Sequence, residues 1–120
     1  MQLPWDYIES KRGALLLACV DGVPAGMVAL REFALNSCEM RRLYVHPSFR
    51  GYGVGRRLLH RLIKRAQEFD YTYMLFNTLP AMQQARKLYN DLGFYAIEPY
   101  DEKPHQGVLY GCLTLTYHKP

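Results

Sequence analysis

A long amphipathic segment at residues 53–69 constrains the fold of this chain more than any other feature. Its apolar residues recur at intervals of three and four, which is the period of an α-helix with one buried face. The apolar set is Val54, Leu58, Leu59, Leu62, Ile63, Ala66 and Phe69, and the remaining face carries Arg56, Arg57, His60, Arg61, Lys64 and Arg65. The sequence therefore predicts a helix with one stripe in the core and a basic, solvated surface.

Three apolar segments before this helix predict β-strands. Residues 14–20 and 25–33 flank the sequence DGVP, so they predict two antiparallel strands joined by a tight turn. Residues 38–45 predict a third strand, which ends at His46 and Pro47 because proline lacks a backbone N–H and restricts the residue before it.

The segments after the helix predict a strand, a second helix and two further strands. The second helix begins at Pro80, and Gly93 caps its carboxyl end. The predicted bounds of the four elements are residues 71–78, 80–92, 94–97 and 108–117. The order of elements predicts an α/β (α+β) fold, a mixed sheet with helices packed on it, in one domain that spans residues 1–120.

The composition of the chain excludes several classes of protein. Its 120 residues are 49% hydrophobic and 22% charged, as in an ordinary globular domain. The longest apolar run, residues 14–20, is far shorter than the ~20 residues that cross a bilayer, and no signal-peptide pattern surrounds it. We therefore expect a cytoplasmic protein. The three cysteines are widely separated and the four histidines show no metal-ligand spacing, so we expect reduced thiols and no metal.

A glycine-rich stretch, HPSFRGYGVG, joins the third predicted strand to the long helix. The start of a helix presents unpaired backbone N–H groups and a positive dipole end, and glycine lets an anion approach the backbone closely. The spacing of Gly51, Gly53 and Gly55 fits neither the dinucleotide fingerprint nor the P-loop. The net charge of +4 suits an anionic ligand but does not distinguish a nucleotide from a nucleic acid. On these residues alone, a phosphate cradle and a mobile turn both remain open.

Three motifs together resemble the GCN5-related N-acetyltransferase (GNAT) family. RGYGVG at residues 50–55 resembles that family's R/Q-x-x-G-x-G/A signature, and MRRLYVHPSFRG resembles the strand that precedes the signature. ARKLYNDLGF at residues 85–94 resembles a later helix and strand start. The motifs stand in the family's order, and the resemblance covers roughly residues 15–115. It implies a mixed, mainly antiparallel sheet in which two parallel central strands splay apart, here residues 38–45 and 73–77.

The resemblance also implies acetyl-coenzyme A as the cosubstrate, held in the gap between the splayed strands. Its pyrophosphate would rest on the amides of the glycine-rich loop, and its pantetheine would pair with the backbone of the preceding strand. The implied cofactor-binding residues are Leu43, Tyr44, Val45, Arg50, Gly51, Tyr52, Gly53, Val54, Gly55 and Arg56.

Acetyl transfer to an amine needs a deprotonated amine and a proton for the leaving thiolate. The resemblance implies that Tyr89 is the general acid; the alternative is that its ring packs in the core. Glu39 is the candidate general base; the alternatives are a solvent-facing side chain or an ion pair with Arg41 or Arg42.

The amino end is shorter than the family pattern implies. Only residues 1–13 precede the first predicted strand, where members usually have a strand and two helices. We therefore expect a homodimer in which a second subunit covers the exposed sheet face.

The expected function is direct transfer of an acetyl group to a small-molecule or peptide amine in a ternary complex. A non-catalytic coenzyme A-binding or assembly module is the alternative. A nucleic-acid binder that uses the basic helix face is disfavoured, because no nucleic-acid motif is present.

Overall fold

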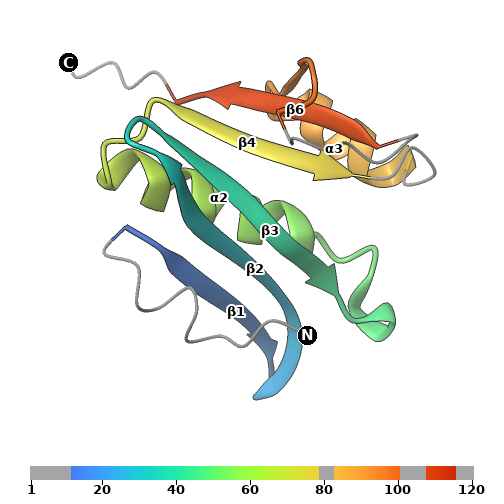
Figure 1. Ribbon diagram of the computed structural model, residues 1–120. Helices are drawn as coiled ribbons and strands as arrows, with labels where there is room; N and C mark the ends of the chain where they lie inside the picture. The colour runs from blue at the N-terminus through green and yellow to red at the C-terminus, as the bar shows by residue number, and fades with distance from the viewer. Residues whose placement is uncertain (1–11, 79–82, 101–107, 116–120) are drawn as a thin grey trace.

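The computed structural model describes residues 12–78, 83–100 and 108–115. Its elements in chain order are β1 (Ala14–Val20), β2 (Val23–Ala34), β3 (Ser37–Val45), the 3₁₀ turn η1 (Pro47–Phe49), α2 (Val54–Glu68), β4 (Tyr73–Thr78), α3 (Gln83–Asp91), β5 (Tyr95–Ala96) and β6 (Leu109–Thr114). The strands form one sheet in the order β1-β2-β3-β4-β6-β5 (Figure 1). β3 and β4 run parallel, and every other neighbouring pair is antiparallel. The predicted fold class and order of elements are confirmed.

The turn between β1 and β2 is tighter than the sequence predicted. Asp21 and Gly22 have φ values of 50° and 81°, and Val20 faces Val23 directly across the hairpin. Two central residues with positive φ form a two-residue type I′ turn, which matches the twist of the flanking strands and favours an Asp-Gly pair. The second strand therefore starts at Val23 and not at Ala25. Pro24 lies inside the strand, at a register irregularity opposite Cys19.

The predicted long helix is α2, with Gly53 and Phe69 as its caps. Its apolar stripe packs on one face of the sheet, against Val28 and Leu30 of β2 and Cys38 and Met40 of β3. The buried residues of the helix are Val54, Leu58, Leu59, Leu62 and Ala66. Tyr89 of α3 belongs to the same core cluster, so both helices cover the same face of the sheet.

Gly26 sets how closely the start of α2 approaches the sheet. A Cβ atom at this position would lie 2.7 Å from the carbonyl oxygen of Tyr44 and 3.2 Å from side-chain atoms of Leu58 and Val54. Any larger residue would have to push the helix or β3 away. The glycine therefore holds the first turn of α2 against the end of β3.

A glycine cap ends α3 as predicted. Gly93 has a φ of 96°, its N–H donates to the carbonyl of Asn90, and the N–H of Phe94 donates to the carbonyl of Tyr89 at 2.9 Å. This pair of bonds is the Schellman arrangement. The predicted first residue of the helix, Pro80, lies outside the described residues. Within the described part of the chain, no helix is long and apolar enough to cross a membrane.

Candidate active site

The central strands β3 and β4 separate soon after they start. Their parallel pairing covers three residue pairs and ends at Glu39 opposite Leu75. β3 stays paired with β2 as far as Val45, and β4 stays paired with β6 as far as Thr78. The two strands therefore diverge toward their carboxyl ends and form a V, which Figure 1 shows between the arrows of β3 and β4. Inside the V, the backbone of β3 from Met40 onward has no strand partner among the described residues on the side of β4, so it offers donors and acceptors to a ligand.

A β-bulge at Arg42 shapes the wall of this V. Arg42 has a φ of 62°, and two residues of β3, Arg42 and Leu43, oppose Val28 of β2. A non-glycine residue in the left-handed region costs roughly 1–2 kcal/mol. The extra residue reverses which side chains face α2: Cys38 and Met40 face the core before it, and Leu43 and Val45 face the core after it.

The start of α2 lies at the end of β3, across the glycine-rich loop. Gly51 and Gly53 have φ values of 89° and 80°, which favour glycine strongly. Gly53 is the N-cap, and its carbonyl accepts the first intrahelical bond, from the N–H of Arg57 at 3.1 Å. No described side chain caps the helix, and its first turn contains no acidic residue. The amides of Val54, Gly55 and Arg56 therefore have no intrahelical acceptor, which is the arrangement that favours an anion at a helix start.

The glycines of the loop differ in their surroundings. A Cβ atom at Gly51 or Gly53 would meet no atom of the described residues within 4 Å, whereas one at Gly55 would lie 3.6 Å from Val45 and 3.9 Å from Leu88. The space above the first two glycines is thus open to a ligand. Gly55 lies in ordinary contact distance of both β3 and α3.

Two arginines predicted to bind the cofactor make protein contacts. The Nε of Arg50 donates to the carbonyl of Val45 at 3.0 Å, and its guanidinium lies 6.0 Å from the ring centre of Tyr44. Arg56 forms an ion pair with Asp91 at 3.2 Å, which links the start of α2 to the end of α3. Both contacts hold the loop in place next to the V. Tyr52 is largely exposed.

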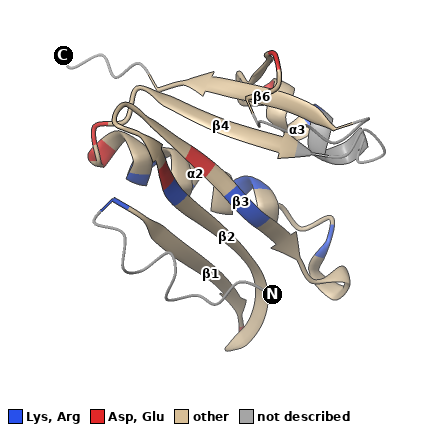
Figure 2. Ribbon diagram, viewed as in Figure 1, with Lys and Arg blue, Asp and Glu red and all other residues tan. Residues whose placement is uncertain are grey.

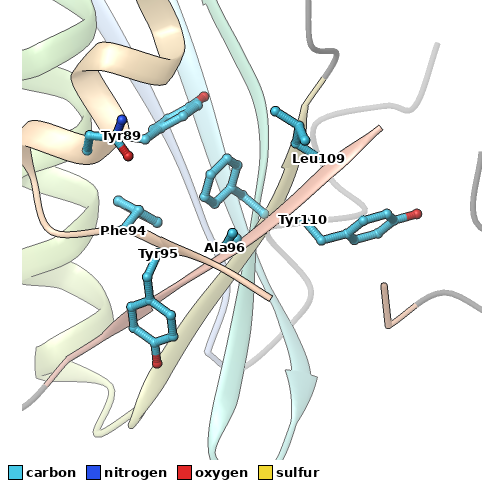
Figure 3. A pocket seen from close by; sticks show the side chains of 9 residues that line it. Tyr89, Phe94, Tyr95, Ala96, Leu109 and Tyr110 are labelled. Atoms are coloured by element: carbon cyan, nitrogen blue, oxygen red, sulfur yellow. The ribbon is translucent and has the colours of Figure 1, made fainter. Parts of the chain in front are cut away.

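Tyr89 is buried in an aromatic cluster on the helix-covered face of the sheet. Its ring centre lies 4.2 Å from that of Phe76 on β4 and 5.5 Å from that of Phe94. Burial raises the pKa of Tyr89 to about 12. The same three rings border a pocket of about 150 Å³. Figure 3 shows Tyr89 and Phe94 on one side of this pocket and Leu109 and Tyr110 on the other. The ring of Tyr89 therefore packs in the core, as the alternative to a catalytic role predicted, and it also borders a cavity.

Glu39 lies on the opposite face of the sheet, because its neighbours Cys38 and Met40 face the core. It is 3% exposed, so the alternative of a solvent-facing side chain is wrong. Its Oε1 accepts from Arg31 Nε at 3.0 Å and from Arg41 Nη1 at 3.3 Å. Its Oε2 accepts from the hydroxyl of Tyr100 at 2.7 Å. The ion pair with Arg41 was one of the predicted alternatives, whereas Arg31 and Tyr100 were not predicted as partners.

The two candidate catalytic residues flank the V from opposite faces. Glu39 sits at its vertex, as the last residue of β3 that pairs with β4. Tyr89 packs on Phe76 of β4, one position beyond the last paired residue, on the face covered by the helices. A reaction centre inside the V would thus have a carboxylate on one side and a phenol on the other.

The cysteines and histidines add no second site among the described residues. No group of three or more His, Cys, Asp or Glu side chains there could hold a metal ion. Cys19, Cys38 and Cys112 are free thiols, and burial raises the pKa of Cys38 to about 12, as expected for a structural thiol. His46 has a local role, because its Nδ1 accepts from the N–H of Ser48 at 3.1 Å and caps η1.

Comparison with known proteins gives one consistent family. A family model described as the acetyltransferase (GNAT) family matches residues 1–94. An uncharacterized N-acetyltransferase of Schizosaccharomyces pombe is similar at 37% identity over 96 residues, which are 79% of this chain and 59% of that protein. N-acetylaspartate synthetase of Rattus norvegicus is 32% identical over 89 residues, which are 73% of this chain and 30% of that protein. The chain thus spans less than two thirds of the length of these curated relatives.

A solved structure shows the same fold at lower sequence similarity. A protein from Bacillus anthracis, solved in complex with acetyl coenzyme A, has a TM-score of 0.81 and 21% sequence identity. The match covers 95% of this chain and 69% of that chain. At this identity the likeness concerns the fold.

Proposed function

Because the chain belongs to the GNAT family of acetyltransferases, we propose that it transfers an acetyl group from acetyl-coenzyme A to an amine acceptor. The transfer is direct and takes place in a ternary complex. The observation that carries the proposal is the start of α2, which no described side chain caps, beside the open V. That arrangement puts an anion site next to a strand edge with free backbone groups, which suits a ligand with a pyrophosphate at one end and an amide-containing arm at the other.

The cosubstrate is held mainly by backbone groups. Its pyrophosphate binds the amides between Arg50 and Arg56, where Gly51 and Gly53 leave open space. Its pantetheine arm lies in the V and pairs with the backbone of β3 from Leu43 to Val45, immediately after the bulge. The side chains of Arg50 and Arg56 hold the loop and the two helices in place for this contact.

The transfer itself forms a C–N bond and breaks the C–S bond of the thioester. The attacking amine loses a proton, for which Glu39 is the proposed acceptor, directly or through a water. The leaving thiolate gains a proton, for which Tyr89 is the proposed donor. Their positions on opposite faces of the sheet support separate roles, one toward the acceptor and one toward the cosubstrate.

Replacing Glu39 with glutamine tests its role as the base. We expect kcat/KM to fall by about 10²- to 10⁴-fold. Glu32→Gln on β2 is the matched control, because it removes an exposed carboxylate that pairs with Arg12 at 3.4 Å. If the Glu39→Gln variant keeps the wild-type rate and pH profile, Glu39 is not the base and its role is limited to its ion pairs.

The proposal as a whole is tested by two measurements on the purified chain. Calorimetric titration with acetyl-coenzyme A measures binding, and release of free coenzyme A in the presence of a panel of amines measures transfer. Saturable binding together with amine-dependent release is expected. Binding without turnover would identify a non-catalytic coenzyme A-binding module, and no binding would reject the function.

The acceptor is proposed to be a small-molecule amine. The rat relative is named for an acetylated amino acid, and this favours a small molecule over a peptide. A nucleic-acid role is not proposed: the basic face of α2 starts at the loop that would hold the phosphates. The free thiols fit a cytoplasmic location, which we propose as well.

A homodimer is proposed from the exposed apolar side chains of the sheet. Ala14, Leu16 and Ala18 of β1 pack on the core, so Leu17 points to the opposite face, where it is 65% exposed. Phe33 of β2 is 43% exposed. A second copy would cover such a surface. Light scattering at micromolar concentration should give twice the mass of one chain, and a monodisperse monomer would contradict the proposal.

A further inference from the structure

The sheet face opposite α2 carries two arginines that share a single buried carboxylate. Arg31 of β2 and Arg41 of β3 both donate to Oε1 of Glu39, at 3.0 and 3.3 Å. We propose that this arginine pair, Arg31 and Arg41, binds a carboxylate group of the amine acceptor. The inference rests on the proposed acetyl transfer and adds the chemical class of the acceptor.

The arginine pair lies beside the vertex of the V, around the carboxylate of Glu39. Arg41 is two residues beyond Glu39, in the part of β3 that has separated from β4. Across the gap, Asn77 is two residues beyond Leu75 on β4, and its Nδ2 donates to the hydroxyl of Tyr100 at 3.4 Å. That hydroxyl donates in turn to Glu39. A polar cluster therefore spans the V on the face away from α2, the loop and Tyr89, which is the face left for the acceptor.

The charges of the cluster favour an anion. Two guanidinium groups oppose one carboxylate, so the cluster carries a net charge of +1. Both oxygens of Glu39 already accept hydrogen bonds. Figure 2 shows basic segments of β2 and β3 near the acidic segment of β3. A second carboxylate fits this charge, whereas a diamine or polyamine would be repelled.

The guanidinium groups also retain hydrogen-bond capacity. Each has five N–H donors, and each donates once to Glu39 among the described residues. The side chains are 39% and 35% exposed, whereas that of Glu39 is 4% exposed. One arginine would suffice to neutralise the buried carboxylate. Glu39 fixes the direction of the planar groups of both arginines, and their remaining N–H donors suit bidentate binding of a second carboxylate.

The test compares an amino acid with its own amide as acceptor. L-alanine and L-alaninamide differ in the carboxylate, and the amine of the amide is the less basic of the two. A larger fraction of the amide is therefore reactive at neutral pH, so a preference for the acid reports binding of the carboxylate. We expect kcat/KM to be higher for L-alanine than for L-alaninamide, and L-aspartate to be accepted as well.

Arg41→Met should lower kcat/KM for L-alanine by about 10- to 10²-fold, mainly through KM, because a charged hydrogen-bonded contact is lost. The ratio of kcat/KM for L-alanine to kcat/KM for L-alaninamide should fall toward one. Arg31→Met should lower this ratio as well. Arg41→Lys keeps the charge but loses the planar group that donates two parallel hydrogen bonds, so its ratio should lie between those of wild type and Arg41→Met. Arg61→Met, on the exposed face of α2, removes the same charge and should keep the ratio.

Binding gives a readout that does not need turnover. Calorimetric titration of L-aspartate into the protein saturated with coenzyme A should show binding that Arg41→Met weakens. If amines without a carboxylate are acetylated equally well and Arg41→Met keeps the wild-type ratio, the carboxylate site is wrong while acetyl transfer stands. If coenzyme A binds but no amine is acetylated, the proposed catalysis fails, and the titration with L-aspartate alone decides on the carboxylate site: no binding overturns it.

Discussion

Replacing Tyr89 with phenylalanine is expected to lower kcat for acetyl transfer by about 10²- to 10⁴-fold and to leave the affinity for acetyl-coenzyme A largely unchanged. The substitution removes the phenolic O–H and keeps the ring that packs on Phe76 and Phe94. The pKa of about 12 means that the hydroxyl holds its proton throughout the neutral range. It is therefore always available to donate to a thiolate, and deprotonation of Tyr89 should not limit the rate until the pH nears 12.

The control for this variant is Tyr73→Phe, which removes the same group from the first residue of β4, opposite Ser37 and away from the open end of the V. Steady-state rates and a calorimetric titration on both variants separate catalysis from binding. An unchanged kcat in Tyr89→Phe would remove Tyr89 from the mechanism and leave it a role in packing.

Replacing Gly53 with glutamate is expected to weaken acetyl-coenzyme A binding by at least about 10²-fold, because like charges placed together in a binding site cost several kcal/mol. Within the described part of the chain, a Cβ atom at this position meets no atom within 4 Å, so the side chain would enter the open space next to the amides. There its carboxylate would repel the pyrophosphate. The φ of 80° adds backbone strain of roughly 1–2 kcal/mol, which should lower the melting temperature.

A matched control separates the strain from the charge. Gly22 has nearly the same φ, 81°, and equally open surroundings, but it lies in the β1–β2 turn. Gly22→Glu should lower the melting temperature similarly and keep the affinity for acetyl-coenzyme A. Gly53→Ala carries the strain without the charge and should bind more tightly than Gly53→Glu. Equal affinities for wild type and Gly53→Glu would refute the anion site.

Features that depend on local periodicity could be predicted from the sequence. The bounds of α2 follow from its apolar stripe, and the cap at Gly93 follows from the preference of a left-handed residue for glycine. The anion site at the helix start also rests on local chemistry, and it stays a prediction. The splayed strands were implied by the resemblance to the family, and the structure has them.

Features that depend on contacts between distant segments could not be predicted in this way. Glu39 meets Arg31 only because β2 and β3 are in a particular register, and it meets Tyr100 across 61 positions of the chain. The bulge at Arg42 is visible in the sequence pattern of β3. The core-facing apolar residues change from even positions, Cys38 and Met40, to odd positions, Leu43 and Val45. A strand that changes phase in this way contains an extra residue.

The early separation of β3 and β4 leaves few backbone contacts between the two halves of the sheet. Within the described sheet, three residue pairs join β1–β3 to β4–β6. Side-chain contacts add to them, among them the ion pair between Arg56 and Asp91, the hydrogen bond from Tyr100 to Glu39 and the shared core. A ligand that fills the V would act as a missing strand across this seam. By mass action, a ligand at 100 times its Kd stabilises the folded state by about 2.7 kcal/mol. If acetyl-coenzyme A binds in the V as proposed, the free energy of unfolding should rise with its concentration.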